Sequence, residues 1–139
     1  MINNKTYNLF ISHGWDRDEE YIRLVNNLNQ YSNFQWRNYS VSIANPLSGG
    51  TQRKLSVEID RQLRLASAVL IISGIYVTYR EWINFEIDLA DKYDKPIIGI
   101  IPRGNIYIPN AVKEFAWEIV RWYTPSIIKA IMRTTDQLS

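Results

Sequence analysis

The chain alternates short apolar runs with longer segments in which apolar residues recur every three or four positions. Two runs, Ala68 to Ser73 and Ile97 to Ile101, are almost continuously apolar, which is typical of strands covered on both faces. The segments Glu19 to Tyr31, Thr51 to Leu65 and Arg80 to Tyr93 carry their apolar residues at helical spacing. The pattern therefore predicts strands that alternate with helices.

Three further strands are weaker in the pattern. Tyr7 to Ser12 reads as a first strand, Asn38 to Ala44 as a second because apolar and polar residues alternate there, and Glu118 to Trp122 as a fifth. A short helical turn is expected over Ala111 to Phe115 and a last helix from Pro125. This order predicts an α/β fold with a central parallel five-stranded sheet and helices on both faces.

Composition limits the class of protein. A chain of 139 residues with 46% apolar content is expected to form one domain over residues 1–139. No apolar run approaches the roughly 20 residues that span a bilayer, and the first residues lack a signal-peptide pattern. We therefore expect a cytoplasmic protein that does not enter a membrane.

Net charge and the kinds of reactive side chain limit the partners, metal sites and catalytic groups that this chain can have. The net charge is only +2, and its basic residues are scattered among acidic ones, so we expect no nucleic-acid partner. The chain has no cysteine and one histidine, His13, which excludes disulfides, thiolate metal ligands and a multi-histidine metal site within one chain. We predict no metal, and any catalysis must rest on carboxylates, hydroxyls or that imidazole.

The loops that follow parallel strands converge on one edge of the sheet, where open α/β sheets bind ligands. Here they are His13 to Asp16, Asn45 to Gly50 and the segment from Ser73 to Glu86. Their glycines would let backbone N–H groups approach a phosphate, but glycines serve turns equally well. Neither GxGxxG nor GxxxxGK[ST] occurs.

Trp82 and Glu86 are the most informative pair in this edge. They lie four residues apart just after a buried strand, so they share one face of a helix. By spacing alone, a lone helical glutamate such as Glu86 is more often solvated than functional, and a tryptophan such as Trp82 more often packs than contacts a ligand. A phosphoacceptor receiver domain is set aside, because such a site needs aspartates at strand ends and strands one and three end in serine.

Two segments resemble the Toll/interleukin-1 receptor (TIR) family. Tyr7 to His13 resembles the first TIR box, an aromatic residue followed by a strand that ends in Phe-Ile-Ser-Tyr, with His13 in place of the usual tyrosine. Glu81 to Glu86 is similar to the Ser-x-Trp-Cys-x-x-Glu segment, with Trp82 and Glu86 in register and Ile83 in place of cysteine. The resemblance covers nearly the whole chain and is greatest to the bacterial branch with the Thoeris antiphage proteins.

The resemblance implies a flavodoxin-like fold and cleavage of the nicotinamide–ribose bond of NAD, with NAD as substrate and no resident cofactor. Glu86 aligns with the required glutamate, and an ADP-ribose-derived product, linear or cyclic, would activate a separate effector. Self-association through TIR-type surfaces is also implied. The substrate-binding residues would be Ser12, His13, Gly14, Trp15, Asp16, Ser48, Gly49, Ser73 and Trp82.

Some features depart from the receptor-type pattern. The loop Asn45 to Gly50 lacks its Arg-Asp and Pro-Gly residues, and no Phe-Trp third box is evident near the C-terminus. Two other hypotheses therefore stand beside the NAD-consuming enzyme. One is a non-catalytic TIR-type interaction module, and the other is a nucleotide-binding sensor or nucleoside-processing enzyme that uses the same edge of the sheet.

Overall fold

The computed structural model describes residues 5–12, 19–41, 51–73, 80–104 and 107–136. Strands and helices alternate along them, as the apolar pattern predicts. In chain order they are β1 (Thr6–Ser12), α1 (Glu19–Gln30), β2 (Gln35–Asn38), α2 (Thr51–Leu65), β3 (Ala68–Ile72), α4 (Arg80–Lys92), β4 (Ile97–Ile101), α5 (Asn110–Phe115), β5 (Glu118–Arg121) and α6 (Thr124–Asp136).

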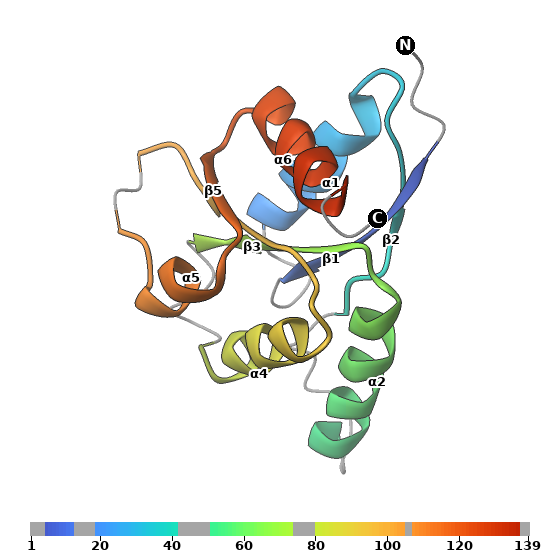
Figure 1. Ribbon diagram of the computed structural model, residues 1–139, viewed down its shortest axis with the longest axis vertical. Helices are drawn as coiled ribbons and strands as arrows, with labels where there is room; N and C mark the ends of the chain where they lie inside the picture. Colours follow the sequence, from blue (N-terminus) through green and yellow to red (C-terminus); the bar gives the residue numbers. More distant parts are fainter. Residues whose placement is uncertain (1–4, 13–18, 42–50, 74–79, 105–106, 137–139) are drawn as a thin grey trace.

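The five strands form one sheet in the order β2-β1-β3-β4-β5, and every pairing is parallel. Helices α1 and α6 cover one face, and α2, α4 and α5 cover the other (Figure 1). This is the flavodoxin-like arrangement, and the predicted α/β class is confirmed. The strand order reverses between β1 and β3. The helix that follows β1, α1, covers one face of the sheet, and the helix that follows β3, α4, covers the other.

The three central strands form the core. All residues of β3 and β4 are buried, which explains their continuous apolar runs, because helices cover both of their faces. The edge strands β2 and β5 are only partly buried. Gly99 in β4 allows α5 to pack closely, since a Cβ placed there would lie 2.8 Å from Val112 Cγ1.

The second strand was predicted in the wrong place. It spans Gln35–Asn38 and not Asn38 to Ala44, of which residues 42–44 lie outside the described residues. The Tyr39 amide still donates to the Leu9 carbonyl (2.9 Å). At Ser40 side chains replace the backbone: the Ile11 amide donates to Ser40 Oγ (2.8 Å), and the Ser40 amide donates to Asn38 Oδ1 (3.0 Å). Such local side-chain bonds compete with a strand ladder, and alternation of residue types does not reveal them.

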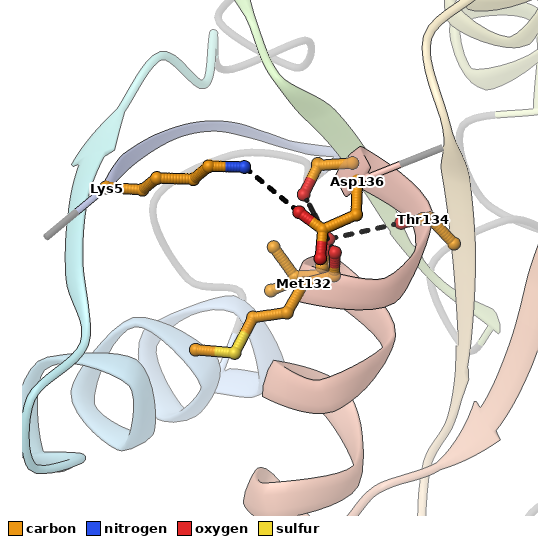
Figure 2. Close-up of polar contacts among 6 residues, drawn as sticks. Lys5, Met132, Thr134 and Asp136 are labelled. Carbon is orange, nitrogen blue, oxygen red and sulfur yellow. Dashed lines mark hydrogen bonds and ion pairs between the residues drawn. The ribbon is translucent and has the colours of Figure 1, made fainter. Parts of the chain in front are cut away.

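The two ends of the described chain meet at the amino ends of the strands. Lys5 Nζ lies 3.0 Å from Asp136 Oδ1, so the start of β1 is tied to the end of α6 (Figure 2). Both side chains are more than half exposed, and exposed ion pairs of this kind contribute little stability. The contact is distant along the strands from the edge where ligands are expected.

Candidate active site

Ser12 is placed by the alternation of β1. Successive side chains of a strand point to opposite faces, so Ser12 and Phe10 point to one face and Ile11 to the other. As the last residue of β1, Ser12 also lies at the carboxyl edge of the sheet, beside the point where the strand order reverses. Its side chain is fully buried.

Glu86 reaches this point from α4. The buried positions of α4 include Ile83, Glu86, Ile87 and Ala90, which follow the i, i+3, i+4, i+7 spacing of a helix face that packs on a sheet. Glu86 therefore occupies a core position, and its exposed fraction is 0%. A carboxyl group at such a position is costly to bury unless it is paired or protonated.

The two side chains meet. Ser12 Oγ donates a hydrogen bond to Glu86 Oε1, while Glu86 Oε2 is buried and has no hydrogen-bond partner within the described residues. Burial raises the pKa of Glu86 to about 8, and the Ser12 hydrogen bond opposes this rise by favouring the ionised form. A buried carboxyl with a perturbed pKa and a spare oxygen is a typical feature of functional sites.

Ser73 carries a second buried side-chain oxygen at this edge of the sheet. It directly follows β3, one residue beyond the observed end of the strand, and is 2% exposed. Among the described residues its Oγ has no hydrogen-bond partner. Buried hydroxyls without partners are uncommon, and β3 is the strand next to β1. Two buried oxygens without a partner among the described residues, Ser73 Oγ and Glu86 Oε2, therefore lie at the same edge of the sheet.

Trp82 shares a flank of α4 with Glu86 but has a different environment. It is half-buried and lines a cavity of about 460 Å³ between α2 and α4, together with Arg53, Ser56, Glu81 and Phe85. Sequence reasoning did not single out the other four for the site. Nothing in their spacing marks them, because only the packing of α2 against α4 brings them together.

The remaining predicted site residues lie outside the described residues: His13, Gly14, Trp15, Asp16, Ser48 and Gly49.

Within the described residues, no group of three acidic or histidine side chains is close enough to hold a metal ion. No described helix is both long and apolar enough to cross a membrane.

Another cavity, of about 330 Å³, lies at the opposite edge of the sheet. Its lining includes Lys5, Ser67 and Lys95, which all precede or begin strands. It is therefore separated from Glu86 by the length of the strands. We assign the site to the carboxyl edge, because two of the three buried side-chain oxygens that lack a partner among the described residues, Ser73 Oγ and Glu86 Oε2, lie there.

Comparison with known proteins supports this family and this fold. The sequence profile of the TIR-like domain of the Thoeris protein ThsB matches residues 10–106. The chain belongs to this TIR-like family. The match begins inside β1 and includes Ser12, Ser73, Trp82 and Glu86. The family resemblance stated from the sequence is confirmed.

Among solved structures, the CMP N-glycosidase BcmB of Clostridium botulinum is similar in fold. It aligns with a TM-score of 0.54 over 90% of this chain and 98% of that chain, with 11% sequence identity. At this identity the likeness concerns the fold alone. No curated protein matches the chain.

Proposed function

We propose that this TIR-like protein is an N-glycosidase that cleaves the nicotinamide–ribose bond of NAD, with Glu86 as the catalytic residue. The observation that carries the proposal is the buried Glu86 carboxyl at the carboxyl edge of β1. Its Oε1 accepts a hydrogen bond from Ser12, and its Oε2 has no partner among the described residues. The membership in the ThsB family and the fold shared with a nucleotide N-glycosidase support it.

One carboxylate suffices for this reaction. Nicotinamide in NAD is a cationic leaving group, so the C1′–N bond breaks without protonation of the base, unlike an ordinary glycoside. The ribose then acquires oxocarbenium character, which the Glu86 carboxylate stabilises or anchors through the ribose hydroxyls. Water, or a nucleophilic group of the same molecule, completes the step by bonding to C1′ and gives a linear or cyclic ADP-ribose product.

The raised pKa of Glu86 fits a cationic substrate. At neutral pH the free enzyme holds Glu86 mostly protonated, since burial raises its pKa to about 8. A positive ring placed beside the carboxyl favours the ionised form. Binding of NAD would therefore lower the pKa of Glu86 and give the carboxylate that the reaction needs. The Ser12 hydrogen bond acts in the same direction.

A second candidate substrate is a pyrimidine nucleotide such as CMP, because the structural neighbour is a CMP N-glycosidase. Cytosine is a neutral leaving group and requires a general acid. Protonated Glu86 would serve as that acid. The two substrates therefore need opposite protonation states of one residue.

Because the two substrates need opposite protonation states of Glu86, the pH dependence of the activity distinguishes them. For NAD, kcat/KM should rise with pH up to about 8; for CMP, it should fall above about 8. Mass spectrometry of the products of concentrated protein with NAD or CMP, compared with Glu86→Gln, identifies the substrate and the fate of the ribose. Turnover of NAD that persists in a folded Glu86→Gln variant would rule out the assigned role.

Membership in the ThsB family supports a proposal about the wider role. We propose that the ADP-ribose-derived product is a signal for a separate effector in antiphage defence, and that the protein self-associates through TIR-type surfaces. Assays should therefore be repeated at high protein concentration and with extract of infected cells. Absence of NAD and CMP cleavage under all these conditions would favour a non-catalytic TIR-type module.

A further inference from the structure

The cavity at the amino edge of the sheet joins four segments of the chain. Its lining comes from the start of β1, the α2–β3 connection, the α4–β4 connection and the last turn of α6, and includes Lys5, Ser67, Lys95 and Thr135. Its volume is about 330 Å³. Small-molecule sites begin at roughly this size, so the cavity has room for a small metabolite.

Two lysines reach the cavity from different strands. Lys5 directly precedes β1 and Lys95 lies two residues before β4, and β3 lies between these strands in the sheet. Neighbouring strands are about 4.8 Å apart, so the two backbones are separated by about 10 Å. Lysine has a flexible four-carbon stem, and both ammonium groups can therefore approach one ligand that lies between them.

Lys95 carries a positive charge that the protein does not balance locally. Its side chain is half-buried, and burial lowers its pKa. Among the described residues it forms no ion pair and no side-chain hydrogen bond, and the neighbouring Asp94 is exposed and does not pair with it. Burial of an ammonium group without a partner is unfavourable, so a negatively charged ligand would supply an interaction that the protein lacks.

Lys5 brings a second ammonium group and neutralises a nearby carboxylate. Its Nζ lies 3.0 Å from Asp136 Oδ1 (Figure 2), and Asp136 directly follows Thr135 of the cavity lining. This ion pair reduces the repulsion that Asp136 would exert on an anion. An ammonium group has three N–H donors, so Lys5 can contact Asp136 and a ligand oxygen together.

Two hydroxyls of the lining are already bonded to the protein. Ser67 Oγ accepts from the Asn8 amide at 3.0 Å, and Thr135 Oγ1 donates to the Ile131 carbonyl at 2.7 Å. They hold the walls of the cavity in place. Recognition of a ligand therefore falls to the ammonium groups.

We propose that this cavity binds a small phosphorylated metabolite, with the phosphate held between Lys95 and Lys5. Lysine binds phosphate as a point charge, and the three free oxygens of a phosphate monoester can accept from both ammonium groups at once. The rest of the cavity would hold a group about the size of a sugar. Because the cavity lies at the opposite edge of the sheet from Glu86, this site is separate from the proposed catalytic site and does not depend on it.

Ribose 5-phosphate and ribose test the phosphate, because they differ only in that group. In calorimetry, ribose 5-phosphate should bind with a dissociation constant below about 1 mM and at least tenfold more tightly than ribose. Inorganic phosphate should compete with it. Neither sugar carries a base, so cleavage of a base–ribose bond cannot consume the probes.

Lys95 is tested by three variants. Lys95→Gln should weaken ribose 5-phosphate binding at least tenfold, because a charge-assisted hydrogen bond is lost, and Lys95→Arg should retain most of the affinity because it keeps the charge. The matched control Lys92→Gln removes the same charge from an exposed position at the end of α4, outside the cavity lining. It should leave the affinity unchanged. Without ligand, Lys95→Gln should be at least as stable to urea as the wild type, since it removes an unpaired charge.

Lys5 is tested together with its partner. Lys5→Gln combined with Asp136→Asn removes both charges of the ion pair and keeps the net charge of the protein. The affinity for ribose 5-phosphate should fall about threefold. Such a loss would come from the missing ammonium contact, because the overall charge is the same.

Four results would overturn the proposal. They are equal affinity for ribose and ribose 5-phosphate, no binding of either phosphate probe below about 10 mM, unchanged binding in Lys95→Gln, and a loss in Lys92→Gln as large as that in Lys95→Gln. Unchanged binding in Lys95→Gln would place the phosphate elsewhere on the protein. Equal losses in the two lysine variants would show a general effect of charge.

Discussion

Ser12 Oγ, at the end of β1, donates a hydrogen bond to Glu86 Oε1 on α4, 74 residues further along the chain. Both residues are fully buried. This bond stabilises the ionised form of a carboxyl whose burial favours the protonated form. The balance of these two effects leads to distinct expectations for stability and for activity.

The stability of the protein should depend on the ionisation of Glu86. Its pKa is raised from 4.5 to about 8 in the folded state, so the folded protein keeps a proton there that the unfolded chain loses. The free energy of unfolding should therefore decrease as pH rises from about 4.5 to about 8, and then level off.

Glu86→Gln removes this dependence while keeping an acceptor for Ser12. We expect the variant to be more stable than the wild type at pH 8 by an amount on the order of a few kcal/mol, with the difference vanishing near pH 4. Urea denaturation of both proteins across this range measures it. A constant difference at every pH would contradict the assigned protonation.

Ser12→Ala should shift the pH dependence of activity. Loss of the donor removes the interaction that favours the carboxylate, so the pKa of Glu86 should rise further, and the acid limb of kcat/KM for NAD should move to higher pH. The free energy of unfolding at low pH should fall by about 1–3 kcal/mol, because a buried acceptor loses its partner.

Ser67→Ala is the matched control for that variant. Ser67 Oγ accepts a hydrogen bond of 3.0 Å from the Asn8 amide near the other end of β1. It should lose stability to a similar degree with an unchanged pH profile. Identical profiles for Ser12→Ala and the wild type would mean that Ser12 has a packing role only.

Ser73→Ala should separate ligand binding from stability. Because Ser73 Oγ is buried without a partner in the described residues, its removal should leave the free energy of unfolding unchanged or raise it by about 1 kcal/mol. If the hydroxyl binds the substrate, KM should rise several-fold while kcat changes little. Thermal unfolding and steady-state kinetics check both parts; a large loss of stability would indicate a protein partner for the hydroxyl.

Gly99→Ala should destabilise the contact between β4 and α5. The new Cβ would lie 2.8 Å from Val112 Cγ1, and Val112 is fully buried, so overpacking should cost about 1–3 kcal/mol. The double variant with Val112→Ala should lose less than the sum of the single changes. Additive losses in urea denaturation would show that the side chains do not compete for space.

The sequence by itself determined the type and order of most elements. The runs at Ala68 to Ile72 and Ile97 to Ile101 are apolar because both faces of these strands are covered, and such runs require no knowledge of their partners. The second strand was misplaced because side-chain bonds of Asn38 and Ser40 end its ladder. The likeness around Trp82 and Glu86 identified the family that the profile match confirms.

Only the tertiary structure decided the environment of the candidate site. A glutamate at a helical position next to Ile83 and Ile87 is compatible with solvent until α4 is packed on the sheet, where Glu86 becomes fully buried. The hydrogen bond from Ser12 and the cavity that joins Arg53 to Glu81 link elements far apart in the chain. Burial and long-range proximity arise from the packing of whole elements, and local residue spacing does not encode them.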